Sequence, residues 1–498
     1  MLNRLNLKPL AVAVTLACAA SAASSATANK ADLARLLEKL NQRVEKLEQR
    51  NAELENQLRA SRAPAANTTA AAALAQRVQT LETQQAQVER GLEKESISER
   101  EPDLTARLKL LESQAVNAQS AVRKVGAFDG VSAGFSLTTV AQTHRGIPAA
   151  SSQLNYRGDA YVSLPLAKIG DIEHKVYAQF RLGQGQGLND APSFAKPNAS
   201  AFRVQSTAAD DAVAVLGQAW YQADIPLPFG GYKPHSKETL ELNFGKMDPF
   251  VFFDQNAAAG DETRQFLNTI FVHNPLLDAG GDIGVDANGF APGFRLSYVN
   301  ASAKPQTWRV SLGVFGAGVQ GANYQRSLSA PLVMLQAETE QRLMQGLAGN
   351  YRVYAWRNPQ AAHYDAAVAG PEQHSGWGMS ADQRVGDGVT VFGRYGHQLQ
   401  GHVSFDRALT LGAEFNGSYW GRGGDRMGVA LGWLKISQDY RAFSGTASGA
   451  EKVGEWYYRW RINSQFELSP NFQYFGNPAG EGGADAIKVL GLRAQISY

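Results

Sequence analysis

The sequence is poor in cysteine, with a single one, Cys18, among its 498 residues. Cys18 lies within the first 28 residues, which have the features of a cleavable leader, so we expect the mature chain to carry no thiol. A disulfide framework, a cysteine-ligated metal site and a cysteine nucleophile are thereby excluded.

Long apolar runs are also missing. No uninterrupted stretch of about 20 apolar residues occurs, so a membrane-spanning helix is not expected. The mean hydropathy of -0.29 and the 49 glycines instead suit a wall built from strands, whose residues alternate between lipid and water.

A large excess of charge of one sign is absent. The chain has 48 basic and 46 acidic residues, and Arg4 and Lys8 in the leader account for the difference. An electrically neutral mature chain argues against nucleic-acid binding.

Signatures of catalysis are lacking as well. The sequence contains no His-Glu-x-x-His, no Gly-x-Ser-x-Gly and no phosphate loop ending in Gly-Lys-Ser/Thr, so we predict neither an enzyme nor a cofactor. Asp278, Asp282, Asp286 and Asn288 form an oxygen-rich stretch. Their spacing is not that of a helix-loop-helix calcium site. We interpret the stretch as a solvated loop and predict no metal site.

The amino-terminal residues predict export. Arg4 and Lys8 precede an apolar core, and Ala26-Thr27-Ala28 offers small residues for cleavage before Asn29. Cleavage after Ala22 also fits. Residues 1–28 are therefore predicted to be a signal peptide.

Residues 29–125 have a helical pattern, with Pro64 and Pro102 as breaks. A polar Asn51 takes one core position in the first of its three runs. The apolar core positions of that run alternate four and three residues apart: Leu33, Leu37, Leu40, Val44, Leu47, Leu54 and Leu58. We predict a periplasmic coiled coil, with a lone solvated helix as the alternative. Its leucines do not decide between two and three chains.

After Gly126 the period of the apolar pattern changes to 2, which is the period of a strand. We predict that residues 126–498 form an all-β transmembrane barrel of about 16 antiparallel strands, with a soluble sandwich as the alternative. The predicted strands cover residues 131–141, 154–165, 174–182, 213–226, 239–246, 292–299, 307–315, 332–339, 351–356, 376–383, 389–395, 409–418, 427–436, 455–463, 468–475 and 487–498.

The last predicted strand shows the alternation most clearly. Apolar residues occupy every second position up to the terminal Tyr498, and Arg493, Gln495 and Ser497 lie between them. Bacterial outer-membrane barrels close with such a strand. Short links at residues 385–388 and 468–470 are predicted to be tight hairpin turns, whereas other links are long.

Two stretches resemble the carbohydrate-selective porins of Gram-negative outer membranes, the OprB type. The first is LELNFGKMDPFVFFDQNAAAGDETRQFLN, residues 240–268. The second runs from residue 405 to the carboxyl end and has a Trp-x-Arg-x-x-Asp-x-x-Gly pattern at Trp420, Arg422, Asp425 and Gly428. The resemblance implies a monomeric sixteen-stranded barrel, surrounded by outer-membrane lipid and lipopolysaccharide, that passes sugars. The predicted coiled coil departs from the plain family and suggests a homotrimer or contact with peptidoglycan.

A sugar-selective pore needs hydrogen-bonding groups and apolar faces at its constriction. We predict a polar wall of arginines flanked by apolar residues, together with carboxylates. The alternative is that these arginines face the lumen only because lipid excludes them. The candidates are Arg181, Arg295, Arg352, Arg394, Arg459, Arg461, Arg493, Glu241, Glu414 and Glu455.

Residues 248–290 form the longest link that is rich in both aromatic residues and carboxylates. We predict that this link folds inward and narrows the channel. Its candidate constriction residues are Phe252, Phe253, Asp254 and Asn256.

The sequence therefore favours an outer-membrane porin for passive diffusion of mono- or oligosaccharides. An anion- or dicarboxylate-selective porin is the alternative, which would be favoured by arginines that converge without facing carboxylates. A structural tether to the cell wall through the coiled coil is a second alternative.

Overall fold

The computed structural model describes residues 130–147, 152–202, 214–232, 235–277, 289–318, 328–344 and 346–498. The predicted signal peptide, the predicted coiled coil and the oxygen-rich stretch at residues 278–288 lie outside the described residues.

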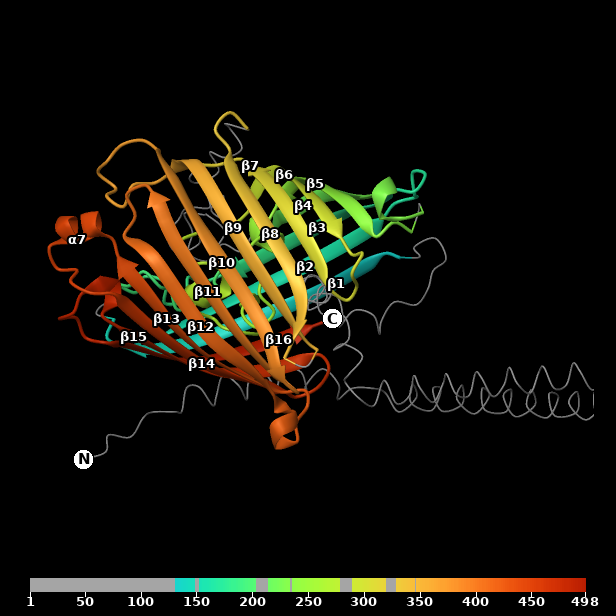
Figure 1. Ribbon diagram of the computed structural model, residues 1–498. Coiled ribbons are helices and arrows are strands. Elements are labelled where there is room, and N and C mark those ends of the chain that lie inside the picture. The colour runs from blue at the N-terminus through green and yellow to red at the C-terminus, as the bar shows by residue number, and fades with distance from the viewer. Residues whose placement is uncertain are drawn as a thin grey trace, which may run out of the picture. The chain divides into compact units, whose positions relative to one another are not determined.

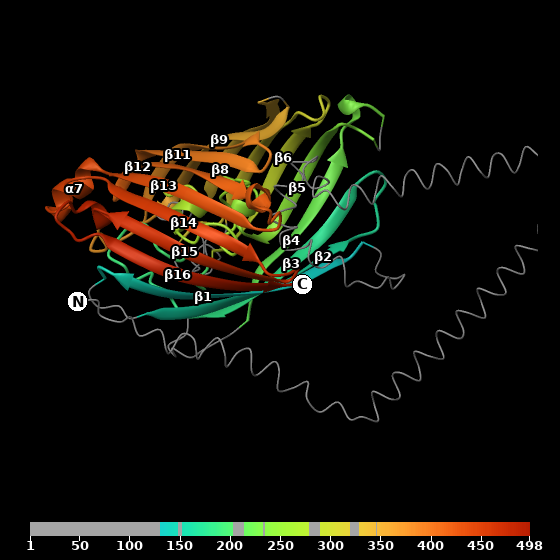
Figure 2. The same cartoon turned by 90° about the horizontal axis from the view of Figure 1, so that it is seen from below.

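The described residues form a closed barrel of sixteen antiparallel strands (Figures 1 and 2). Each strand pairs with its neighbours in sequence, and β1 pairs with β16. Closure leaves no strand edge unpaired, which is what backbone groups in lipid require. The predicted fold class is confirmed.

Each predicted strand segment falls on one observed strand. Most observed strands are longer; β9, for example, extends well beyond the predicted residues 351–356. The strands are β1 Ser132–Arg145, β2 Gln153–Pro165, β3 Glu173–Gln184, β4 Val215–Pro226, β5 Glu238–Met247, β6 Ala291–Asn300, β7 Thr307–Phe315, β8 Leu332–Leu343, β9 Leu347–Ala361, β10 Glu372–Gly386, β11 Val389–Gln400, β12 Phe405–Asn416, β13 Arg426–Ile436, β14 Glu451–Arg461, β15 Phe466–Gly476 and β16 Ile487–Ser497.

Side chains alternate between the two faces of the wall. On β16, Arg493 and Gln495 are buried inside the barrel, whereas Leu490 and Ile496 are exposed on its outer surface. Exposed apolar residues occupy outward positions all around the barrel, including Phe244, Leu335 and Leu431. The outer surface is therefore apolar, and the polar side chains gather inside.

The connections divide the barrel into two ends. The connections that follow even-numbered strands lie at one end and include the tight turn Asp387-Gly388. Gly388 has φ +95°, a positive value that hairpin turns of this kind require. We call this end of the barrel the turn end, and the carboxyl terminus lies there as well. The longest connections follow β3, β5, β7 and β13 at the opposite end, which we call the loop end.

The turn predicted at residues 468–470 is wrong, because these residues lie within β15. Pro470 has no N–H to donate, and the pairing of β15 with β14 is interrupted beside it, between Asn471 and Leu468. A proline is tolerated in a strand at such an interruption.

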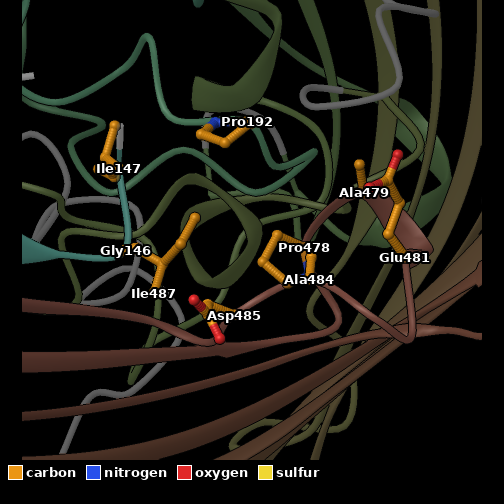
Figure 3. A pocket seen from close by; sticks show the side chains of 9 residues that line it. All are labelled: Gly146, Ile147, Pro192, Pro478, Ala479, Glu481, Ala484, Asp485 and Ile487. Atoms are coloured by element: carbon orange, nitrogen blue, oxygen red, sulfur yellow. The ribbon is translucent and has the colours of Figure 1, made fainter. Parts of the chain in front are cut away.

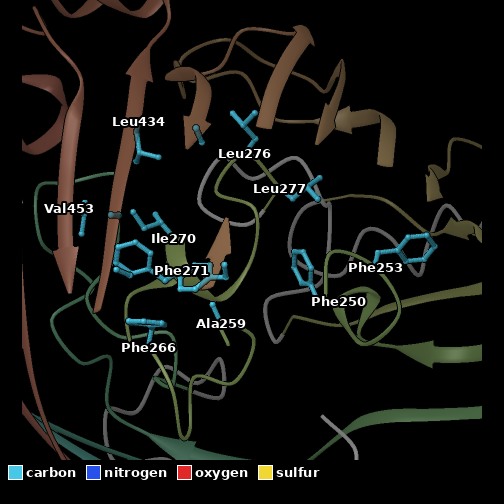
Figure 4. Close-up of a cluster of buried hydrophobic side chains, with 14 of the residues drawn as sticks. Phe250, Phe253, Ala259, Phe266, Ile270, Phe271, Leu276, Leu277, Leu434 and Val453 are labelled. Atoms are coloured by element: carbon cyan, nitrogen blue, oxygen red, sulfur yellow. The ribbon is translucent and has the colours of Figure 1, made fainter. Parts of the chain in front are cut away.

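Two connections enter the barrel from the loop end, and we call them the inserted segments. The first is residues 185–202, and the second is residues 248–277, which contain η3 (Pro249–Val251) and α5 (Thr269–Val272). The second segment carries Phe266, Ile270 and Phe271, which belong to the buried apolar core with wall residues such as Leu434 and Val453 (Figure 4). The second inserted segment thus packs against the inner wall of the barrel.

The remaining helices are short and lie in connections. They are η2 (Pro228–Gly230), η5 (Gly417–Trp420), α7 (Gln438–Ser444) and η6 (Pro478–Gly480). In the part of the chain that the structure describes, no helix has the length and apolar character needed to cross a membrane.

The Trp-x-Arg-x-x-Asp-x-x-Gly pattern forms a clasp at the turn end. The buried Asp425 carboxylate accepts hydrogen bonds from Arg422 Nε (2.5 Å), Tyr458 Oη (2.5 Å) and the Arg461 amide (2.9 Å). It therefore ties the turn after β12 to the end of β14. Gly428 is needed because a Cβ there would approach the Tyr457 ring to 2.2 Å. This motif is structural.

We expect Asp425→Asn to lower the free energy of unfolding by about 2 kcal/mol at neutral pH, because it weakens charge-assisted hydrogen bonds at a buried site. Burial alone would raise the pKa of the Asp425 carboxyl, but the bonds from Arg422, Tyr458 and the Arg461 amide outweigh it and lower that pKa.

A lowered pKa means that the contribution is complete above the unfolded-state pKa near 4 and is lost as the pH falls through the folded-state pKa. Unfolding in urea at several pH values measures the difference between the two proteins. A difference that stays constant well below pH 4 would contradict this account. Asp387→Asn, in another turn at the same end, is the control.

Candidate functional site

The predicted arginines face the interior, but they differ in access to solvent. Arg295, Arg352, Arg394 and Arg493 are buried. The side chains of Arg181 and Arg459 are 13% and 15% exposed. Arg461 is exposed at the turn end of β14. The buried arginines are therefore poorly placed to meet a solute, and the partly exposed ones are better placed.

Two buried arginines hold the second inserted segment by its backbone. Arg394 donates to the carbonyl oxygens of Phe271 (2.7 Å), Asp254 (3.1 Å) and Ala259 (2.6 Å). Arg493 donates to the carbonyls of Glu262 (2.9 Å) and Gln265 (2.8 Å). These guanidinium groups act as anchors from strands β11 and β16.

Two buried glutamates on β14 hold the amide groups of the inserted segments. Glu455 accepts from the amides of Leu267 (2.7 Å) and Asn268 (2.9 Å) in the second segment. Glu451 accepts from the amides of Phe194 and Ala195 in the first, both at 2.9 Å. Sequence reasoning predicted neither Glu451 nor the inward fold of residues 185–202. Glu451 shares the inward face of β14 with Glu455, so the strand period was a signal for it.

The four predicted constriction residues are buried within the inserted segment. Asp254 accepts from Arg394 Nε (3.2 Å), Tyr354 Oη (2.8 Å) and the Asn274 amide (2.5 Å). It therefore anchors the segment to β9 and β11. The Asn256 side chain donates to Ser380 (3.2 Å) and to the Ala381 carbonyl on β10.

The two predicted phenylalanines also pack inward. Phe253 lies edge-on to Phe315 on β7. Phe252 packs edge-on against Trp220, with ring centroids 5.6 Å apart, and carries the guanidinium of Arg295 over its ring at 5.0 Å. Both rings fix the shape of the segment from within.

Alternating charges line the wall between β5 and β10. Glu241 binds Arg295 and Arg309, each at 3.0 Å. Arg309 continues to Glu338 (3.6 Å). Further along the wall, Arg352 binds Asp382 (3.0 Å). Each predicted arginine of this wall therefore faces a carboxylate.

A second charge cluster joins β2, β3 and the inserted segment. Asp159 binds Arg157 (2.9 Å) and Arg181 (2.6 Å), and Arg157 also binds Glu262 (2.7 Å). Burial alone would raise the pKa of the Glu262 carboxyl, but Arg157 and Arg181 outweigh it and lower that pKa. Glu262 is therefore held in its charged form.

A third cluster lies near the turn end of β14 and β15. Glu467 lies between Arg264 of the inserted segment (3.3 Å) and Arg459 (3.9 Å). Nearby, Glu414 accepts from Tyr457 Oη (2.7 Å). Arg459 and Glu414 were predicted to face the lumen from their strand positions. Arg264 and Glu467 were not predicted, because their roles depend on how the segment folds back.

An aromatic row lies along the inner face of β2, β3 and β4. Tyr161 stacks on Tyr177 with centroids 6.2 Å apart, and Tyr177 stacks on Trp220 at 4.7 Å. Phe252 extends the row from the inserted segment. All four rings are buried, so the row packs the inserted segment against the wall.

A separate cavity of about 490 Å³ opens at the loop end (Figure 3). Ile147, Pro192, Pro478 and Ile487 line it, together with the acidic residues Glu481 and Asp485. Among the residues that the structure describes, no cluster of His, Cys, Asp and Glu could hold a metal ion.

Comparison with known proteins supports this architecture. The model of the carbohydrate-selective porin, OprB family, matches residues 151–498. OprB of Pseudomonas putida is 19% identical, with a TM-score of 0.56 over 74% of this chain and 93% of that chain. The outer membrane channel DcaP of Acinetobacter baumannii is 12% identical, with a TM-score of 0.44 over 76% of this chain and 100% of that chain. No curated protein sequence matches.

We expect Arg394→Met to release the second inserted segment and raise the single-channel conductance. It removes the donor to three carbonyls and leaves Asp254 charged and buried, which should cost about 3–5 kcal/mol of stability. Planar-bilayer recording and thermal unfolding measure the two effects. Arg357→Met, on the outer face of β9, is the matched control.

The double variant Arg394→Met/Asp254→Asn should recover part of the stability, because it removes both charges of the pair. Unchanged conductance in the single variant, with a correctly folded barrel, would contradict the anchoring role.

Proposed function

Because the chain belongs to the carbohydrate-selective porin, OprB family, we propose that it lets small neutral saccharides diffuse passively through its barrel. The protein is an outer-membrane channel and not an enzyme.

The observation that carries the proposal is the pairing of charges in the lumen. Arg181 lies 2.6 Å from Asp159, Arg295 lies 3.0 Å from Glu241, and Arg352 lies 3.0 Å from Asp382. A lumen that presents cations and carboxylates side by side offers no strong preference to an anion. A sugar hydroxyl can accept from a guanidinium and donate to a carboxylate, so paired charges suit it.

The partly exposed charges are the proposed solute contacts. Glu241 is 16% exposed, and its partner Arg309 is 13% exposed. We assign the same role to Arg181, Arg459 and Glu414. The buried Arg394 and Arg493 would act indirectly, because they position the segment that narrows the lumen.

Sugar block of the ion current tests the proposal. We expect glucose and short oligosaccharides to block the full-length protein saturably in a planar bilayer, with weak ion selectivity. Block by dicarboxylates alone, with strong anion preference, would contradict it and favour the anion-selective alternative.

Glu241→Gln makes the test residue-specific. Without this carboxylate, Arg295 and Arg309 lose a shared partner, so we expect sugar block to weaken about tenfold and anion preference to rise. Glu173→Gln is the matched control, because Glu173 pairs with Lys168 in an exposed position at the turn end. Equal sugar block in all three proteins would rule out Glu241 as a contact.

We make a separate proposal for the role of residues 29–125. As a coiled coil they would join three barrels into a homotrimer or reach peptidoglycan in the periplasm, after removal of a signal peptide at residues 1–28. The barrel domain at residues 126–498 would then act as the pore alone.

We expect deletion of residues 30–125 to leave the sugar block unchanged and to abolish trimers or peptidoglycan co-sedimentation. Light scattering in detergent and binding to purified cell wall measure these two properties. A deletion variant that keeps both would contradict a role in assembly or anchoring.

A further inference from the structure

The cavity of about 490 Å³ at the loop end is separate from the lumen residues that are proposed to contact the solute (Figure 3). Its volume lies within the range of small-molecule sites, roughly 300–1,000 Å³. The longer connections of outer-membrane barrels lie on the extracellular side, so the cavity opens toward the outside of the cell. A solute that arrives from outside therefore meets the cavity before it meets the lumen contacts.

Apolar side chains from three connections form most of the cavity wall. Ile147 follows β1, and Pro192 belongs to the first inserted segment. Pro478 is in η6, and Ile487 begins β16. Ile147 and Ile487 are buried. A wall of this kind displaces water from the apolar part of a ligand.

Glu481 and Asp485 are the charged residues of the wall. Both belong to the β15–β16 connection, and none of the nine residues that line the cavity is basic. One oxygen of Glu481 accepts a hydrogen bond from Thr446 Oγ1 (2.8 Å). Asp485 is exposed and forms no ion pair within the part of the chain that the structure describes. The cavity therefore presents hydrogen-bond acceptors and negative charge to a ligand.

The basic residues closest in sequence to the cavity wall do not pair with its carboxylates in the described ranges. Arg145 and Lys488 adjoin lining residues, but the strand period directs both to the outer face of the barrel. The ammonium of Lys196, in the first inserted segment, donates to the carbonyls of Ala191 (2.9 Å) and Ser193 (2.8 Å). The cavity thus differs from the charge clusters of the lumen, whose carboxylates are paired with arginines.

A buried carboxylate on β14 holds the cavity in shape. Glu451 accepts from the amides of Phe194 and Ala195 and from the amide of Ala479 (2.7 Å) in η6. It therefore joins the segment that carries Pro192 to the connection that carries the two acidic residues. Ala479 has φ +53°, a conformation that persists only where the surrounding structure holds it. The cavity is preformed, which lowers the entropy cost of binding.

We propose that this cavity captures saccharides that carry an ammonium group, such as hexosamines. The inference rests on the proposed function, since it takes a saccharide as the solute. The ammonium group is attracted by Glu481 and Asp485, and hydroxyls donate to the same carboxylates. The C–H groups of the sugar ring pack on the proline and isoleucine side chains. An anionic sugar is repelled, and a neutral sugar gains hydrogen bonds without the charge attraction.

Saturation-transfer NMR on the full-length protein in detergent tests the proposal with defined probes. Glucosamine, N-acetylglucosamine and glucose share a ring, and only glucosamine is cationic. Each solvent-accessible carboxylate contributes about threefold to the binding of an ammonium group. We therefore expect glucosamine to bind roughly tenfold more tightly than the two neutral sugars. Cyclohexylammonium and magnesium are the probes for a site that takes any amine or any cation.

Asp485→Asn localises the site, and Asp439→Asn is the matched control. Each variant removes one exposed carboxylate at the loop end, but Asp439 is in α7 and does not line the cavity. We expect the preference for glucosamine to fall to about threefold in Asp485→Asn and to stay unchanged in Asp439→Asn. The heat-dependent gel mobility of folded barrels checks each variant.

Ala484→Leu tests the cavity itself, because it fills part of the space and keeps both carboxylates. It should weaken glucosamine binding, whereas a general attraction of cations to the loop end would not change.

Glu241→Gln separates this inference from the proposed function. It alters a lumen contact, so we expect a weaker sugar block with the preference for glucosamine retained. Conversely, Asp485→Asn should leave the glucose block of the ion current unchanged. If glucose blocks the current but glucosamine shows no preference, the cavity inference alone fails. If no saccharide binds or blocks, the proposed function fails with it.

Further outcomes would overturn the capture of amino sugars. Equal binding of glucosamine and N-acetylglucosamine would remove the role of the ammonium group. Equal affinity for cyclohexylammonium would indicate a site for amines in general, and displacement by magnesium at the same concentration would indicate a plain cation site. An unchanged preference in folded Asp485→Asn, or an equal loss in Asp439→Asn, would assign the effect to the overall charge of the loop end.

Discussion

The absence of water in the bilayer core is the constraint on which the rest of this structure depends. Each backbone N–H and C=O of a spanning strand must bond to a neighbouring strand, so the sheet closes with β1 on β16. Closure fixes an inside and an outside, and the strand period then sorts every side chain to one of them. The interior consequently collects the charges that lipid excludes.

Charges collected in a narrow interior must be compensated, and this protein uses its loops as well as its wall for that purpose. Arg394 donates hydrogen bonds to three backbone carbonyl oxygens of the second inserted segment, and Glu455 accepts hydrogen bonds from two of its backbone amides. Backbone groups that enter the barrel would otherwise be buried without partners, which is costly. The wall and the inserted segments therefore depend on each other, and the shape of the lumen follows from both.

The period of 2 was enough to predict the barrel, its sixteen strands and the inward direction of the arginines. The same period also predicted that Glu241 and Glu414 face inward, because both lie on strands with a clear alternation. Strand ends were less predictable, since strands such as β9 continue past the apolar stretch that reveals them. The turn predicted at Pro470 is wrong because proline is typical of turns, whereas here it lies within a strand whose ladder is interrupted beside it.

The hydrogen bonds between the wall and the inserted segments could not be predicted from the sequence, for a different reason. Arg394 and Asp254 are 140 positions apart, and Glu451 lies 256 positions from Ala195. A local pattern carries no information about such a pairing. The sequence showed that residues 248–290 had the composition of an inward loop, but not that Asp254 would serve as an anchor. Residues 185–202 had no comparable signal.

The two faces of the wall differ in how their charges are compensated. Inside, the wall cluster contains three arginines and three carboxylates, and the cluster around Asp159 contains two of each, so both clusters are close to neutral. Outside, Arg145 and Lys488 lie side by side without a carboxylate in register. A neutral lumen suits a solute that must leave again, because strong binding would slow its passage.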